Sequence, residues 1–259
     1  YPKVGQISII HASEMIAMDE APALAVRKKK DSSIAVATRL VKDDVAQGVV
    51  SAGSTGAQMT SSIMYLGRIK GIKRPAIATL MPTLAGPKVI LDIGANTDST
   101  PENLLQFAYM GSLYAEKILD FKVPSVALIN IGTEKTKGNQ LIQQAYELLA
   151  ESKLNFIGNI ETRDITAGIA DVLICDGFLG NSLIKFAEGI ASTFEQMLKK
   201  ELSKNAFRKI GALTLLPSLK GFKKAFDYSE YGGAPLLGVN GVSIVSHGSS
   251  KATAIRNAI

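Results

Sequence analysis

Short, nearly continuous apolar runs alternate with longer amphipathic stretches along most of the chain. Such runs, bounded by glycine, proline and polar residues, are typical of buried parallel strands, whereas apolar positions three and four apart indicate helices. We expect strands at 5–10, 49–51, 74–83, 88–96, 123–131, 156–161, 171–177 and 241–246. Helices are expected at 21–30, 34–45, 58–67, 98–119, 140–152 and 182–198. The alternation predicts a doubly wound α/β fold, with one domain over 1–259 and a mostly parallel sheet covered by helices on both faces.

Polar residues follow the predicted strands at the point where each strand ends. In doubly wound folds ligands bind beyond the carboxyl ends of the parallel strands, so these residues are expected to converge. Ordinary turn and cap chemistry explains much of the same pattern, and that alternative stays open. The positions are His11 and Glu14, 51–56, Asp92 and Asn96, 130–139, Asn159, and 176–181.

The turn after the strand at 49–51 is the first candidate binding site. Gly53 and Gly56 allow a ligand to approach the backbone N–H groups, and Ser54 or Thr55 can cap the following helix, whose N-terminus attracts negative charge. With Ser51 they form a candidate anion cradle, although an ordinary connection between strand and helix would use similar residues. The turn is neither a Walker A loop nor a GxGxxG motif.

Composition narrows the classes of protein. Hydrophobic residues make up 46% and charged residues 20% of the chain, which is ordinary for a globular protein. One cysteine and two histidines argue against a disulfide framework and against a zinc or other metal site. No apolar run is long enough for a transmembrane helix, so we expect a cytoplasmic protein that at most lies on a membrane. The net charge of +6 favours acidic partners, whether protein, phosphate, anionic lipid or nucleic acid.

The segment 197–226 differs from the rest of the chain, because it carries eight basic residues and one acid, Glu201. An apolar stretch at 210–217 divides it, which predicts a basic amphipathic helical hairpin with an apolar tip. Such a hairpin is either a packed subunit interface with solvated lysines or a contact for a membrane or partner. Leu213, Leu215 and Leu216 are the candidate membrane contacts.

His247 follows the last predicted strand and precedes Gly248-Ser249-Ser250. A lone histidine is either a core residue or part of a site. Its place after a strand and beside small polar residues favours the site.

Several long motifs, in order and spread over nearly the whole chain, resemble the bacterial phosphate acyltransferases of phospholipid synthesis, the PlsX family. Two features depart from the family pattern: the chain begins at Tyr1, without the opening Asp-Ala-Met-Gly-Gly-Asp motif, and Ser54 stands where the family usually has Asn. The matching motifs are His11-Ala12-Ser13-Glu14, 27–33, 51–57, 67–75, 91–96, Lys137-Gly138-Asn139, Cys175-Asp176-Gly177-Phe178, 228–235 and 247–250.

The resemblance implies transfer of a fatty acyl group from acyl carrier protein to inorganic phosphate, giving an acyl phosphate for phospholipid synthesis. Because phosphate itself can be the nucleophile, neither a Ser-His-Asp triad nor a covalent intermediate is required, and no cofactor is expected. The residues from Ser51 to Gly56 and Lys137 are candidates for binding phosphate and stabilising the oxyanion. His247 or Asp176 is a candidate for proton transfer. Asn96, Asn139 and Asn181 are candidates for orienting the acyl group or phosphate.

Two rival readings remain open from the residues alone. A phosphotransacetylase-like enzyme using acyl-CoA would have the same architecture, and a non-catalytic module could dock acidic proteins on membranes through the hairpin. As partners we expect acyl carrier protein, inorganic phosphate, an anionic membrane surface and a second copy of the chain in a homodimer, but no nucleic acid. The expected location is the cytoplasm, with peripheral association to the membrane.

Overall fold

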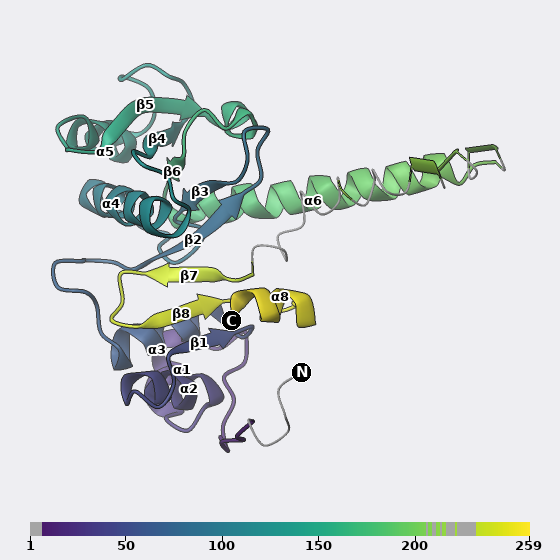
Figure 1. Cartoon of the computed structure of the whole chain (residues 1–259). Helices are drawn as coiled ribbons and strands as arrows, with labels where there is room; N and C mark the ends of the chain where they lie inside the picture. The colour runs from purple at the N-terminus through teal and green to yellow at the C-terminus, as the bar shows by residue number, and fades with distance from the viewer. Residues whose placement is uncertain (1–6, 206, 209–210, 213, 216–220, 222–231) are drawn as a thin grey trace.

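The computed structural model describes residues 7–205, 207–208, 211–212, 214–215, 221 and 232–259. Its centre is one eight-stranded sheet in the order β1-β8-β7-β2-β3-β6-β4-β5 (Figure 1). The strands are β1 (Gly48–Ser51), β2 (Ala76–Met81), β3 (Lys88–Leu91), β4 (Ser125–Asn130), β5 (Asn155–Glu161), β6 (Val172–Ile174), β7 (Ala234–Leu237) and β8 (Val242–Val245).

The sheet contains two parallel groups with an antiparallel junction between them. β3, β6, β4 and β5 are parallel to one another, and Val172 pairs with both Val89 and Val126. At the other edge β1 is parallel to β8. Between these groups, β2 and β7 are antiparallel to each strand that they pair with. The mostly parallel sheet is therefore confirmed, but β1 and β8 run in the opposite sense to β3 when the pairings are followed across the sheet.

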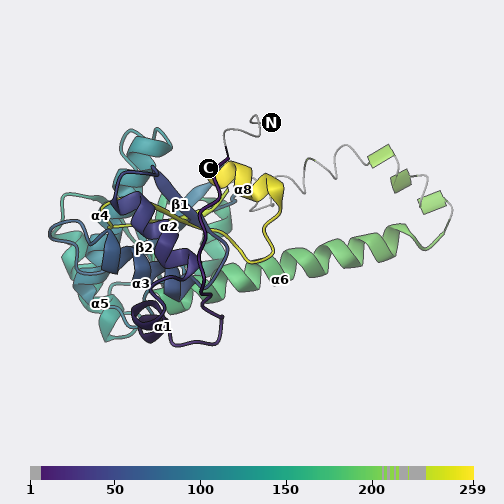
Figure 2. The ribbon, with the colours of Figure 1, turned by 90° about the horizontal axis from the view of Figure 1, so that it is seen from below.

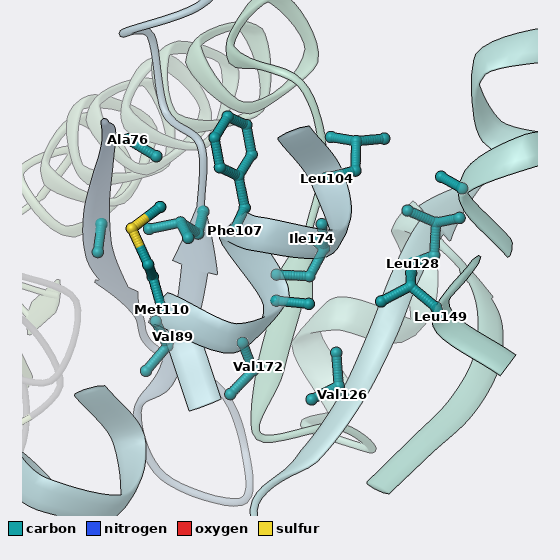
Figure 3. Packing of buried hydrophobic residues seen from close by; sticks show 14 of the residues in the cluster. Ala76, Val89, Leu104, Phe107, Met110, Val126, Leu128, Leu149, Val172 and Ile174 are labelled. Atoms are coloured by element: carbon teal, nitrogen blue, oxygen red, sulfur yellow. The ribbon is translucent and has the colours of Figure 1, made fainter. Parts of the chain in front are cut away.

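Two long helices cover one face of the larger parallel group. α4 (Pro101–Ile118) begins with a capping box between Thr100 and Asn103, and α5 (Gln140–Ala150) begins at the cap Asn139. Leu104 and Phe107 of α4 are fully buried against strand residues in the main hydrophobic cluster (Figure 3). This burial fixes α4 on the sheet, because apolar area removed from water is the main stabilising contribution.

The opposite face is covered by the 3-10 helix η2 (Thr162–Ala167) and by the start of α6 (Gly177–Leu202). Leu179, Leu183 and Ile184 pack against a cluster that includes Ile90 and Leu173. Beyond these residues α6 projects away from the body (Figures 1 and 2). Both faces of the larger group are thus covered, as the apolar runs predicted. None of the helices in the described residues is long and apolar enough to cross a bilayer.

Three helices lie beside β1 and β8: α1 (Pro22–Lys28), α2 (Ser33–Lys42) and α3 (Thr55–Tyr65). α3 is joined to β8 by buried hydrogen bonds. The side-chain amide of Gln58 donates to the carbonyl oxygen of Ile244 at 2.9 Å and to Ser243 Oγ at 3.1 Å. Ser62 Oγ lies 3.0 Å from Ser243 Oγ. These contacts hold the first turns of α3 against β8, which leads into the short helix α8 (Ala252–Ala258).

The structure differs from the predicted elements in several places. Residues 7–10 of the expected first strand are not in a strand, and Ile9 is 95% exposed, because an apolar run forms a strand only where a neighbour pairs with it. β7 was not predicted, since Pro235 and nearby glycines are typical of loops. The helix expected from Ser182 begins five residues earlier, because Asp176 caps it.

Candidate active site

The turn that follows β1 is held by hydroxyl groups. Ser51 Oγ accepts a hydrogen bond from the backbone N–H of Gly53 at 3.2 Å. Ser54 is the N-cap of α3, and its Oγ accepts from the N–H of Ala57 at 3.4 Å. Thr55 is the first residue of the helix. The strand, tight turn and helix expected here are present, and the positive end of the helix dipole faces the turn.

The two glycines of this turn have different surroundings. A Cβ built on Gly56 would lie 2.6 Å from Cγ of Pro22, so the absence of a side chain at Gly56 lets α1 pack on α3. The space beside Gly56 is therefore taken by Pro22 and not left open for an anion. Among the described residues, a Cβ on Gly53 would meet only Ser51 Oγ, at 3.5 Å. Gly53 is therefore the glycine whose backbone a ligand can approach.

The loop after β8 lies beside this turn. The N–H of Ser246 donates to the carbonyl oxygen of Ser51 at 2.8 Å, and a Cβ on Gly248 would lie 3.8 Å from the carbonyl oxygen of Ala52. His247, between them, is exposed. The structure thus brings His247 next to the turn from Ser51 to Gly56, two segments that are almost 200 residues apart in the sequence.

Asp92, directly after β3, organises a second polar group. Its carboxylate accepts five hydrogen bonds, from the backbone N–H groups of Ile77, Gly94, Ala95 and Asn96 and from the Asn96 side-chain amide. Burial raises the pKa of Asp92, although the bonds to its carboxylate act in the other direction. Asn96 Oδ1 is buried and has no hydrogen-bond partner among the described residues.

The first turn of α6 packs directly on the loop that Asp92 organises. The N–H of Gly177 donates to the carbonyl oxygen of Asn96 at 2.8 Å, and Asp176 Oδ1 accepts from the N–H of Leu179 at 2.8 Å. Asn181 lies over Gly94, since a Cβ on that glycine would be 3.5 Å from the Cβ of Asn181. Asn96, Asp176 and Asn181 are therefore neighbours. Asp176 serves as a helix cap, which engages one of its carboxylate oxygens.

The only cysteine adjoins this group but is not a nucleophile. Cys175 is fully buried, and burial together with the nearby carboxylates of Asp176 and Asp92 raises the pKa of its thiol well above the usual value. Because the thiolate is the reactive form, the thiol is inert.

One small hydrophobic cluster joins the two polar groups. Ile93, from the Asp92 loop, and Val245, the last residue of β8, both pack against the cluster of Ile77, Leu236 and Val239. The loop of Asp92 and the loop of His247 therefore have a common support, although they belong to different parallel groups of the sheet.

Lys137 and Asn139 belong to a third group, after β4. Asn139 caps α5, with its Oδ1 accepting from the N–H of Ile142 at 3.0 Å. Lys137 is exposed. Its backbone carbonyl oxygen accepts a hydrogen bond from Asn130 Nδ2 at 3.1 Å. Asn159 also contacts the loop of Lys137, since its side-chain amide donates to the carbonyl oxygen of Glu134 at 3.1 Å. The predicted site residues thus form three groups, of which the first two share a support.

The predicted membrane contacts are described only in part. Leu213 and Leu216 lie outside the described residues, whereas Leu215 is 51% exposed. Sequence reasoning also missed two residues that position others. Ser249, which contacts the His247 ring, was passed over as part of a small polar run, and Asp92 was noted only for its place after a strand.

Solved structures share this fold. A phosphotransacetylase from Streptococcus pyogenes matches with a TM-score of 0.60 and 22% identity, covering 93% of this chain and 72% of that protein. A branched-chain phosphotransacylase from Enterococcus faecalis matches with a TM-score of 0.58 and 14% identity, over 88% of this chain and 78% of that protein. The fold is therefore of the phosphotransacetylase type, and at these identities the likeness concerns the fold alone.

The sequence comparisons identify the family. The family described as "Fatty acid synthesis protein" matches residues 2–259. A phosphate acyltransferase from Heliobacterium modesticaldum is 61% identical over 254 residues, which cover 98% of this chain and 76% of that protein. One from Desulfitobacterium hafniense is 58% identical over 255 residues, with the same coverage. The chain belongs to the phosphate acyltransferase family of fatty acid synthesis proteins.

Proposed function

We propose that this member of the phosphate acyltransferase family transfers a fatty acyl group from acyl carrier protein to inorganic phosphate and supplies acyl phosphate for phospholipid synthesis. The observation that carries the proposal is the family match over residues 2–259 together with relatives more than half identical. The neighbouring turn from Ser51 to Gly56 and loop of His247 supply a place where phosphate can meet the acyl donor.

The reaction needs positioning and charge stabilisation more than proton removal. An anionic oxygen of HPO₄²⁻ attacks the thioester carbonyl carbon, the C–O bond forms, and the C–S bond breaks as the tetrahedral intermediate collapses. The phosphate proton passes to the leaving sulfur, so the products are an acyl phosphate dianion and a thiol. Backbone N–H groups near Gly53 and the charge of Lys137 are proposed to stabilise the anionic oxygens. Asn96, Asp176 and Asn181 are proposed to orient the acyl donor, with Asn139 beside Lys137.

Acyl carrier protein is proposed as donor in place of acyl-CoA because a basic chain attracts an acidic partner protein. The chain has a net charge of +6 and a pI near 9.2, and an opposite charge on the partner accelerates association. Part of the basic charge at the end of α6 is internally paired, since Lys199 contacts Glu195 and Lys204 contacts Glu201. Lys200 is exposed on the same helix.

The donor is tested by supplying acyl-acyl carrier protein or acyl-CoA, each with and without phosphate, and trapping acyl phosphate with hydroxylamine. We expect phosphate-dependent trapping with the carrier-protein donor and a much smaller kcat/KM with acyl-CoA. Equal kcat/KM for both donors would contradict the choice of donor. No acyl phosphate from either donor would contradict the reaction.

We also propose a homodimer formed along α6. Phe186, Ile190 and Met197 lie on one side of the helix, four and seven residues apart, and are 55–69% exposed. α6 projects from the body (Figure 2). Large exposed apolar side chains on one side of such a helix indicate a surface that another molecule covers. A second copy with the same surface would bury both apolar faces.

The dimer is tested by sedimentation of Phe186→Glu/Ile190→Glu, with Ser192→Glu on the other side of α6 as control. We expect the double variant to sediment as a monomer and the control to remain a dimer. A wild-type monomer at micromolar concentration would contradict the proposal.

For the hairpin we propose peripheral contact with an anionic membrane through Leu213, Leu215 and Leu216. We propose that the protein is located in the cytoplasm and meets the membrane from that side.

A further inference from the structure

We infer that Ser249 is a positioning residue that holds His247 in the neutral tautomer with its proton on Nε2, so that His247 donates a hydrogen bond to bound phosphate instead of accepting a proton from it. The inference rests on the proposed function, because it takes phosphate to bind at the turn from Ser51 to Gly56. It assigns a role to Ser249 and replaces proton transfer as the role of His247.

The tautomer follows from the two contacts that Ser249 makes with the ring. The backbone N–H of Ser249 points to Nδ1 of His247, with 3.2 Å between the nitrogens. A backbone N–H can only donate, so Nδ1 must present its lone pair, and a neutral imidazole then carries its proton on Nε2. Ser249 Oγ lies 2.7 Å from the same nitrogen, where its hydroxyl can donate as well.

The loop holds this geometry from both sides. The N–H of Ser250 donates to the carbonyl oxygen of His247 at 2.9 Å, which closes a tight turn around Ser249. On the other side, the N–H of Ser246 donates to the carbonyl oxygen of Ser51 at 2.8 Å. The ring is thus carried on a segment tied to the proposed phosphate turn.

A donor at this position fits the charge of the reaction. The attacking phosphate oxygen is already anionic at neutral pH, so removing a proton from it is unnecessary. Nε2–H can hydrogen-bond to a phosphate oxygen as the C–O bond forms, and the ring ends the cycle in the form in which it began. The proton of HPO₄²⁻ goes to the leaving sulfur, as in the reaction above.

The tautomer can be measured without activity. In protein labelled with ¹⁵N-histidine, long-range ¹H–¹⁵N correlations distinguish protonated from unprotonated ring nitrogens. The chain has only two histidines, so His11→Gln assigns the signals. We expect Nδ1 unprotonated and Nε2 protonated in wild type, and a partial shift toward the other tautomer in Ser249→Ala, which keeps the backbone N–H but loses the hydroxyl. A wild-type ring protonated on Nδ1 at neutral pH overturns the inference.

Kinetics test the role of the Nε2 proton. In His247→Gln the side-chain amide can place an N–H near the position of Nε2, whereas in His247→Asn it reaches only the position of Nδ1. We expect Gln to retain kcat/KM for phosphate within about tenfold of wild type, and Asn and Ala to lose about 100-fold, as for loss of one oxyanion donor. A Gln variant as inactive as Ala overturns the inference, because it shows that the ring must accept a proton.

Ser249 has a matched control in the neighbouring hydroxyl. Ser249→Ala should lower kcat/KM for phosphate several-fold, Ser249→Thr should restore it, and Ser250→Ala should leave it unchanged. Loss in Ser249→Ala that Thr does not rescue overturns the role of the hydroxyl. A protein with the expected tautomer that forms no acyl phosphate contradicts the proposed function, whereas an active protein protonated on Nδ1 contradicts only this inference.

Discussion

Gly180, in the first turn of α6, lies against the backbone of Asp92: a Cβ built on Gly180 would stand 1.9 Å from the Asp92 carbonyl oxygen. A Cβ on Gly177 would likewise lie 2.6 Å from the carbonyl oxygen of Asn96. Only glycine allows the helix to approach the loop so closely. The loop of Asp92 and the base of the projecting helix α6 therefore pack directly against each other.

Gly180→Ala is expected to separate these two elements. The added methyl group meets backbone, which cannot turn aside as a side chain can, so the cost should be about 1–3 kcal/mol of unfolding free energy. Urea unfolding measures this loss. Gly189→Ala is the control, because a Cβ on Gly189 meets nothing within 4 Å in the part of the chain that the structure describes. We expect the control to be as stable as wild type or slightly more stable, since alanine favours helix. Equal stability of Gly180→Ala and wild type would contradict the contact.

The proposed phosphate turn is tested at Gly53. Gly53→Val should lower phosphate-dependent turnover steeply while the melting temperature changes little, because its side chain enters open space beside the backbone N–H groups. Gly56→Val should lower stability instead, because its side chain meets Pro22. Activity and melting temperature of both variants separate the two effects. Normal activity with unchanged phosphate dependence in Gly53→Val would remove the turn from the site.

Much of the fold could be predicted from local pattern. The buried run at β4 and the cap Ser54 predict the observed elements closely, whereas the strand expected at 88–96 ends at Leu91. Strand direction could not be predicted, because the alternation of apolar residues is the same for a strand and its reverse. The sequence therefore predicts β2 as part of a mostly parallel sheet and β7 as a loop. In the structure these two strands form the antiparallel junction of the sheet.

For the candidate site, the sequence predicted which regions lie together but not their individual contacts. Residues after strand ends identified the turn from Ser51 to Gly56 and the loop of His247, which the structure places side by side. The reasons for individual residues come from partners distant in sequence. Gly56 has no room for a side chain because Pro22 packs against it. The pairing of β1 with β8 brings the turn from Ser51 to Gly56 beside the loop of His247. No local pattern contains this information.

Lys137 is expected to contribute charge to the reaction. Lys137→Ala should reduce kcat/KM by about 100-fold, as for one stabilising contact to a developing oxyanion, with little change in melting temperature because the side chain is exposed. The control is Lys135→Ala in the same loop, whose ammonium lies 5.8 Å from the ring centre of Tyr146. Equal losses in both variants would indicate a general effect of loop charge and contradict a specific role for Lys137.

Stability in acid should depend on the pair of Lys88 and Asp171, whose charged atoms are 2.7 Å apart. Burial alone would raise the pKa of Asp171, but bonds from Lys88 and Ser125 outweigh it and lower that pKa. Below the ordinary aspartate pKa, near 3.9, the unfolded chain binds more protons than the folded one. The contribution is therefore complete at neutral pH and is lost as pH falls through the lowered pKa.

Asp171→Asn should cost about 3–5 kcal/mol at pH 7, because it leaves the ammonium of Lys88, 8% exposed, without its charge partner. Unfolding free energies measured from pH 7 to pH 3 should show the gap to wild type narrowing toward acid. Lys88→Met/Asp171→Asn is the control and should recover most of the loss at pH 7. A gap that stays constant with pH would rule out ionisation of Asp171 as its source.

The tip of the hairpin is expected to contact an anionic membrane. Each Lys or Arg near an anionic bilayer contributes about 1 kcal/mol, and the tip leucines add apolar burial. An acyl phosphate is amphipathic, so making it beside a membrane shortens its path to a membrane-bound consumer. Leu213→Glu/Leu216→Glu should therefore abolish flotation with anionic liposomes while acyl-phosphate synthesis in solution continues. Leu84→Glu/Val123→Glu, two exposed apolar positions away from α6, adds the same charge and should still float. Wild-type protein that never floats, or tip variants that float normally, would defeat the assignment.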